Sequence, residues 1–110
     1  MGVSYKVDIH ISNHTAEYTF LDYGYEPHST ETIVFSKDKK QKFLNSLKNF
    51  NIFNWDQHYE DLNVLDGTRW VVEIILESGF VFYFTGNNAY PKKWGAFCRA
   101  IEKLLEKQFQ

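Results

Sequence analysis

The sequence has little of what marks a secreted or membrane protein. Cys98 is the only cysteine, so no intrachain disulfide can form, and this favours a reducing compartment. No apolar run approaches the roughly 18 residues that a membrane span needs. The first residues, MGVSYK, lack the apolar segment of a signal peptide. We therefore expect a cytoplasmic protein without a membrane partner.

An excess of charge of one sign is also lacking. The chain has 12 basic and 14 acidic residues, which leave a formal net charge of −2. This balance disfavours nucleic acid as a partner, because nucleic-acid-binding domains are usually strongly basic. Apolar side chains are plentiful instead: 44% of residues are hydrophobic and 18% aromatic, too many for a disordered chain. The length of 110 residues fits a single domain over 1–110.

Alternating apolar and polar residues predict strands in the first third of the chain. The pattern indicates a strand over 3–11 and a second over 15–22, joined by a two-residue Asn-His turn. That turn would pair Ile11 with Ala16 and place the apolar side chains of both strands on one face. A third short strand is expected over 30–36, after a loop.

Two segments have the apolar spacing of helices. Ser36 is a suitable N-cap for a helix over 37–50. The next segment, 51–67, has no clean period and is interpreted as a connector with one turn of helix. A last helix is expected to begin with Pro91 at its first position. Its apolar stripe consists of Trp94, Phe97, Cys98, Ile101, Leu104 and Leu105.

A β-hairpin is predicted between these helices, with strands over 68–77 and 80–86. A three-residue loop, 77–79, with Gly79 in the left-handed conformation keeps the apolar residues on one face. That inner face comprises Trp70, Val72, Ile74, Leu76, Phe80, Phe82 and Phe84.

The predicted order of elements is β-β-β-α-β-β-α, which is typical of an α+β fold. We expect an antiparallel five-stranded sheet with two helices packed on one face. The second face of the hairpin would then meet solvent, or be covered by neighbouring side chains. If exposed, its apolar residues form a patch for another protein or for a second copy in a homodimer. This patch comprises Val71, Ile75, Val81 and Tyr83, interrupted by Glu73 and Glu77.

Signs of catalysis are few. His58, near Asp56 and Glu60, is the only candidate for metal or acid–base chemistry, and no second cluster has metal-ligand spacing. Cys98 belongs to an apolar stripe, where a thiol stays protonated and inert. The chain has no G-x-S-x-G motif and no glycine-rich phosphate loop. We therefore expect no enzyme, no catalytic residues, no metal and no cofactor.

The basic residues are concentrated in the two predicted helices. Residues 36–50 contain five basic and one acidic residue, and residues 91–110 contain five basic and two acidic. These faces either attract an anionic partner or are ordinary solvated helix surfaces. The lysines concerned are Lys37, Lys39, Lys40, Lys42, Lys92 and Lys93.

Three motifs stand out in the second half: Trp55-x-x-x-Tyr59, Asp66-Gly67-x-x-Trp70 and Gly86-x-Asn88-Ala89-Tyr90-Pro91. Together they resemble a family of small uncharacterised bacterial proteins. The resemblance covers about 60 residues and implies a bacterial or phage origin, but no activity.

The motif residues are interpreted first as determinants of the fold, with Trp70 lying near 86–88. The alternative is a shallow aromatic pocket for a small ligand. Its residues would be Trp55, Tyr59, Asp66, Trp70, Asn87, Asn88 and Tyr90.

The sequence thus favours a small non-catalytic module that binds another protein. Inhibition of that protein, as by immunity or anti-defence proteins, is an analogy from size and acidity. The alternative is a small-ligand-binding protein that uses the aromatic end near Trp55, Trp70 and Tyr90.

Overall fold

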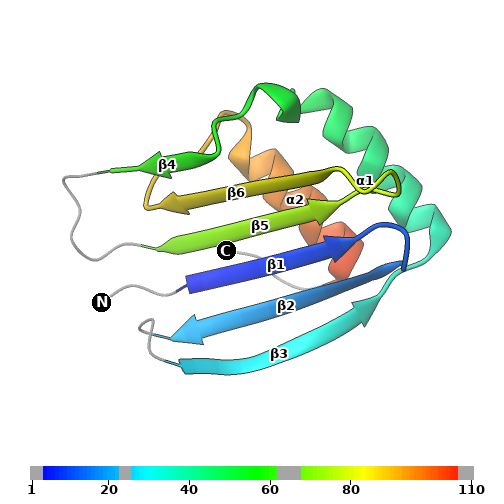
Figure 1. Cartoon of the computed structure of the whole chain (residues 1–110), viewed down its shortest axis with the longest axis horizontal. Coiled ribbons are helices and arrows are strands. Elements are labelled where there is room, and N and C mark those ends of the chain that lie inside the picture. The colour runs from blue at the N-terminus through cyan, green and yellow to red at the C-terminus, as the bar shows by residue number, and fades with distance from the viewer. Residues whose placement is uncertain (1–3, 23–25, 62–67, 107–110) are drawn as a thin grey trace.

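A computed structural model of the protein describes residues 4–22, 26–61 and 68–106. It has an α+β fold in which both helices cover the same face of one sheet (Figure 1). The elements are β1 (Ser4–His10), β2 (Thr15–Asp22), β3 (Glu26–Val34), α1 (Lys37–Asn49), η1 (Ile52–Asn54), β4 (His58–Glu60), β5 (Arg69–Ile75), β6 (Val81–Asn87) and α2 (Trp94–Leu105).

The sheet is mixed and has six strands, so the prediction of five antiparallel strands is wrong. Its order is β3-β2-β1-β5-β6-β4. The central strands β1 and β5 are parallel, and the short strand β4 pairs parallel to β6. Periodicity predicts which face a strand buries but carries no information on which strand lies beside it. The three residues of β4 lie in the segment without a period, and this sixth strand was missed for that reason.

The hairpin of β1 and β2 differs from its predicted register by two residues. A four-residue turn, 11–14, replaces the two-residue turn, so Ile9 pairs with Ala16 where Ile11 was expected. Side chains alternate with a period of two, and the shift therefore leaves every residue on its predicted face. His14 has the left-handed conformation in this turn, with φ of 57°.

Strand β3 begins four residues before its predicted start and includes Pro27. A proline removes one backbone donor, which an edge strand tolerates because one side of it forms no ladder. β3 is an edge strand of this sheet. Residues 26–29, predicted as the end of a loop over 23–29, therefore belong to β3, and residues 23–25 lie outside the described residues.

Helix α1 begins as predicted. The Oγ of Ser36 accepts a hydrogen bond from the N–H of Lys39 at 3.1 Å. Lys40 Nζ donates to Nε2 of His14 and to Oε1 of Glu77, both at 3.1 Å. This ammonium group therefore ties the start of α1 to the turn before β2 and to the loop after β5.

Helix α2 begins at Trp94, three residues after the predicted start at Pro91. Lys93 has φ of 63°, which is incompatible with a helix, so the chain turns there before the helix starts. The predicted apolar stripe of α2 is confirmed, because all six of its side chains are buried.

The hairpin of β5 and β6 has the predicted three-residue loop. The N–H of Leu76 donates to the carbonyl of Phe80 at 2.9 Å, and Gly79 has φ of 92°. The core lies between this sheet and the helices. Its largest fully buried side chains are Trp70, Phe97, Ile9, Ile11, Ile74, Ile101, Val7 and Val72. Within the described ranges, neither helix is long and apolar enough to cross a membrane.

Three carboxylates lie in one row across the open face of the sheet. Asp8 of β1 pairs with Glu17 of β2 on one side and with Glu73 of β5 on the other. Burial raises the pKa of Asp8, and the two flanking carboxylates raise it further, while Lys6, 3.9 Å away, opposes them. Like charges directly opposite each other destabilise a sheet.

Replacing this central carboxylate should stabilise the protein. Near pH 7, Asp8→Asn should raise the free energy of unfolding by about 0.5 kcal/mol, the size of a cross-strand repulsion. A raised pKa means that the folded state holds the proton more tightly than the unfolded state does. The stability due to protonated Asp8 is therefore present below the unfolded pKa of 3.8 and is lost as the pH rises through the folded pKa.

Urea unfolding of wild type and variant at several pH values tests this. The two curves should nearly coincide around pH 3 and separate toward pH 7. A variant that is less stable than wild type near pH 7 would show that the row is not repulsive.

Candidate functional site

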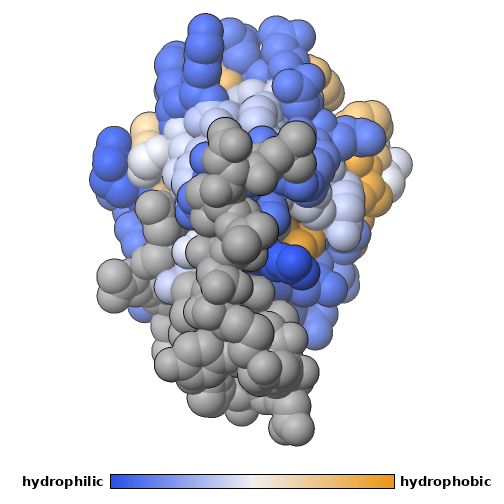
Figure 2. Space-filling model, turned by 90° about the vertical axis from the view of Figure 1, so that its left-hand side faces the viewer, coloured by the Kyte–Doolittle hydropathy of each residue, from blue (hydrophilic) through white to orange (hydrophobic). Residues whose placement is uncertain are grey.

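The sheet face opposite the helices is open in the described structure. In Figure 2, which views the molecule from the left of Figure 1, hydrophobic side chains gather on the right, the side of this open face. Of the predicted patch, Val81 is 45% and Tyr83 48% exposed, while Val71 and Ile75 are half-buried. All four lie on β5 and β6, on neighbouring strands of the sheet.

Two exposed phenylalanines extend this patch around the edge of the sheet. Phe53 is 75% and Phe80 51% exposed. Together with Val81 and Tyr83, they line one hollow of about 140 Å³ at the edge of β6. We call these four residues the apolar corner. Sequence reasoning missed Phe53, because a lone apolar residue in a connector carries no periodic signal, and it placed Phe80 on the inner face.

A second hollow adjoins the apolar corner. It has a volume of about 420 Å³ and lies between the end of α1, the connector and the β5–β6 hairpin. Phe53 is shared by both hollows, and its ring centre lies 4.9 Å from that of Phe82. The apolar walls come from Leu44, Leu47, Ile52, Phe53, Leu76 and Phe82.

The edge of β6 is only partly paired. β4 covers Thr85 to Asn87, and the N–H of Thr85 donates to the carbonyl of Gln57 at 2.9 Å. Backbone groups two residues apart point the same way along a strand, so those of Val81 and Tyr83 also face this edge. No backbone hydrogen bond reaches them there from any described residue.

The predicted ligand-binding aromatics do come together, but they pack against one another. Trp70 is 1% exposed and lies opposite Gly86 across the hairpin, where its indole ring occupies the place of a Cβ. Its indole N–H donates to the carbonyl of Ala89 at 2.9 Å. Rings of Trp94 and Tyr90 lie 4.3 and 6.4 Å from the ring of Trp70. The prediction that Trp70 lies near 86–88 is confirmed.

Trp55 and Tyr59 attach the connector to this cluster. The indole N–H of Trp55 donates to the carbonyl of Phe50 at 3.0 Å, and its ring lies 5.0 Å from that of Phe97. Tyr59 stacks on Trp70 at 6.2 Å, and its hydroxyl accepts from the N–H of Asp56. Both side chains are half-buried and act here as packing residues.

The polar candidates of the same group shape the chain after β6. Asn88 has φ of 53°, and its N–H donates to the carbonyl of Thr68 at 2.8 Å. The carbonyl of Asn87 accepts from the N–H of Asp61 at 3.2 Å. Asp66, together with the predicted Asp-Gly turn, lies outside the described residues.

His58 takes part in a short hydrogen-bonded chain on the open face. Its Nδ1 lies 2.7 Å from the hydroxyl of Thr85, and its Nε2 lies 2.9 Å from Oε1 of Glu60. The order hydroxyl, imidazole, carboxylate is that of a nucleophilic triad. These three side chains lie on the solvent side of β4 and β6, however, and they line neither hollow described above. Both His58 and Glu60 are exposed to solvent among the described residues.

The single thiol and the possible metal ligands among the described residues show no sign of a reactive site. Cys98 is buried, and burial raises the pKa of its thiol to about 12. Among the described residues, no group of three or more histidine, cysteine or carboxylate side chains is placed to hold a metal ion.

Comparison with protein-family models, curated proteins and solved structures finds no match for the chain. The likeness of its motifs to small bacterial proteins stays a prediction.

The contact between Trp70 and Gly86 leads to a stability prediction. Gly86→Ala should lower the free energy of unfolding by about 2–3 kcal/mol, because a methyl group would overlap the indole ring. Gly95→Ala is a matched control on the exposed side of α2, where a Cβ would have only ordinary contact with Arg99. It should raise the free energy of unfolding by about 0.5–1 kcal/mol. Urea unfolding measures both, and equal effects would contradict the assigned contact.

The thiol offers a second check. Folded protein should not react with an aromatic disulfide reagent near pH 8, because Cys98 is buried and its pKa of about 12 keeps it protonated. After unfolding in guanidinium, one thiol per chain should react. Modification of the folded protein at the rate of free cysteine would show that α2 is not packed as described.

Proposed function

We propose that the protein is a non-catalytic, cytoplasmic binding module that recognises another protein through the open face of its sheet. The observation that carries this proposal is the apolar corner. Four large apolar side chains, each about half exposed or more, line one hollow at one edge of the sheet. Exposed apolar side chains that are scattered singly are normal on a protein surface, whereas a contiguous group of them often marks an interaction site.

The row of carboxylates adds a second requirement for the partner. Glu17, Asp8 and Glu73 lie side by side on the face that carries Val81 and Tyr83, and their repulsion lowers stability. Inside the fold, Lys6 lies 3.9 Å from Asp8 and His10 lies 3.3 Å from Glu17, which offsets only part of this repulsion. Unfavourable local arrangements of this kind are expected at functional surfaces. A basic side chain on a partner would relieve the repulsion. The partner surface that fits best is therefore apolar with an adjoining basic group.

The exposed edge of β6 supports the same location. Its unpaired backbone groups at Val81 and Tyr83 can be satisfied by a partner as well as by water. Inhibition of the partner, in the manner of immunity or anti-defence proteins, belongs to this proposal by analogy only. A second copy of the chain is the other partner compatible with these features.

A small-ligand-binding role at the aromatic end has less support. Trp70 is almost completely buried, and its indole N–H already donates to the carbonyl of Ala89. Trp55 likewise donates within the chain, to the carbonyl of Phe50. A ligand there would have to displace contacts that hold the sheet to α2.

Matched variants can test the proposed surface. Val81 and Val34 are both exposed valines of this sheet, Val81 on β6 and Val34 on the edge strand β3, which is separated from β6 by β5, β1 and β2. We expect Val81→Lys to weaken capture of the partner from the native host by roughly tenfold or more, because a buried interface anchor is replaced by a charge. Val34→Lys should leave capture unchanged.

Light scattering of the purified proteins tests self-association in parallel. If the partner is a second copy, the dimer mass should fall to the monomer mass in Val81→Lys alone. Equal capture and equal mass for wild type and Val81→Lys would exclude this surface as the interface.

A further inference from the structure

The helix side of the molecule has an electrostatic character opposite to that of the sheet. Of the 12 basic residues, five lie in 36–50 and five in 91–110, and only Lys6 and Arg69 lie elsewhere. Because α1 and α2 cover the same face of the sheet, the basic residues that lie within these two helices are gathered into one layer (Figure 1). The helix layer is therefore a separate surface from the one proposed above.

The two helices of this layer run antiparallel and are joined at both ends by lysines. At one end, Nζ of Lys39 lies 2.7 Å from a carboxylate oxygen of Glu106, which caps α2. At the other end, Nζ of Lys93 donates to the carbonyl of Asn49 at 2.9 Å. A groove lies between the two helices and is lined by residues of both.

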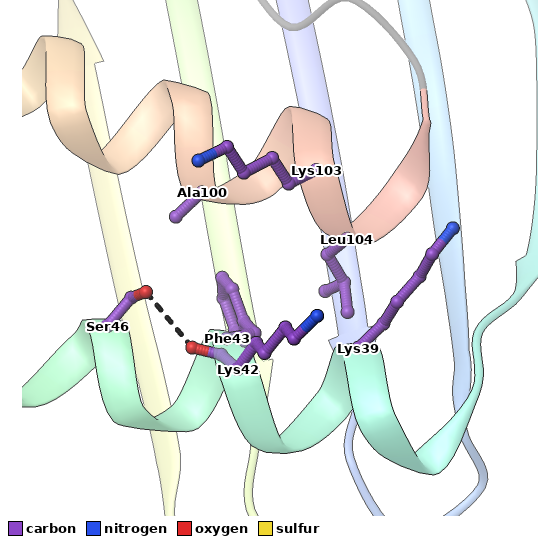
Figure 3. A pocket seen from close by; sticks show the side chains of 7 residues that line it. All are labelled: Lys39, Lys42, Phe43, Ser46, Ala100, Lys103 and Leu104. Atoms are coloured by element: carbon purple, nitrogen blue, oxygen red, sulfur yellow. Dashed lines mark hydrogen bonds between the residues drawn. The ribbon is translucent and has the colours of Figure 1, made fainter.

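Lysines border this groove on both sides, and its floor is apolar (Figure 3). Lys39 and Lys42 extend from α1, and Lys103 extends from α2. The floor is formed by Phe43, Ala100 and Leu104, and the hollow has a volume of about 260 Å³. An apolar floor between two cationic rims is complementary to an amphipathic helix whose apolar stripe is flanked by carboxylates.

Lys39 is engaged with Glu106, but the other two rim cations, Lys42 and Lys103, are available to such a partner. Lys42 is 3.2 Å from Asp38, but both side chains are 77% exposed, and exposed pairs of this kind contribute little. Lys103 forms no ion pair with any other described residue. Partner carboxylates can therefore gain these contacts without breaking a strong one.

Nucleic acid fits the same groove less well. Its bases bind protein through stacking on exposed aromatic rings or arginine. The one aromatic ring of the groove, Phe43, is buried in its floor. An apolar floor offers nothing to a phosphate backbone, whereas leucine-type side chains would be buried on it.

We infer that the groove between α1 and α2 is a docking site for an acidic amphipathic helix of a partner protein. The helix lies along the groove, with apolar side chains over Phe43, Ala100 and Leu104. Its glutamate or aspartate side chains face Lys42 on one rim and Lys103 on the other. This site is independent of the apolar corner and lies on the other side of the molecule.

Designed peptides of about 18 residues provide the probe. The first has leucines at helical spacing i, i+3, i+4 and i+7, flanked by glutamates on both sides. The second has the same composition with the leucine stripe dispersed, and the third has lysine in place of glutamate. Fluorescence anisotropy should show binding of the first peptide, roughly tenfold weaker binding of the second, and none of the third.

Charge reversal then locates the site. The double variant Lys42→Glu, Lys103→Glu should weaken binding of the first peptide by roughly tenfold or more. The control Lys48→Glu, Lys92→Glu makes the same change in net charge with exposed lysines outside the groove, and should bind as wild type does. Circular dichroism confirms that each variant is folded.

Three results would overturn the inference. One is equal binding of the first and second peptides, which would show a response to charge alone. Another is equal loss of binding in the two double variants. The third is tighter binding of a short DNA duplex than of the first peptide, measured at physiological salt. Val81→Lys should leave peptide binding unchanged, so failure here and failure of the proposed function are distinguishable.

Discussion

The fold depends most on one contact, the indole ring of Trp70 lying on the bare backbone of Gly86. A side chain of any other residue at this position would meet the ring, so the two strands can pair in this register only because β6 has a glycine there. The indole then reaches past β6 to the carbonyl of Ala89, and its faces pack against Tyr90 and Trp94. One side chain thereby connects the hairpin, the turn after it and the start of α2.

This arrangement leaves the molecule with two different faces. Both helices pack against one side of the sheet, and the aromatic and aliphatic side chains of the core are buried there. The other side keeps a few exposed apolar side chains, such as Val81 and Tyr83, and the row of carboxylates centred on Asp8. The outer side of the helices is basic. An acidic sheet face and a basic helix face can select partners of opposite charge.

Much of the local structure was predictable, because it depends on interactions between residues that are close in the sequence. Ser36 caps α1 by a hydrogen bond three residues away, and Gly79 alone suits the left-handed position of its hairpin loop. The start of α2 was misplaced for a comparable local reason. Pro91 is compatible with a helix start, but nothing in its neighbours reveals that Lys93 adopts a positive φ. The exposed ring of Phe53 had no signal at all, because one apolar residue in an aperiodic segment defines no face.

What the sequence determined by itself is the class of each long element and the side of it that faces the core. Alternation with a period of two or of 3.6 depends only on neighbours along the chain, so even a shift of two residues between β1 and β2 left every inner residue inside. What only the tertiary structure decided is which strands adjoin. The parallel pair of β1 and β5 joins residues 65 positions apart in the sequence, such as Ser4 and Arg69. Strand β4 likewise pairs with the edge of β6, which its own sequence does not specify. Such pairings arise from the summed packing of the core, which no local pattern records, and they place the carboxylate row on the same open face as Val81 and Tyr83.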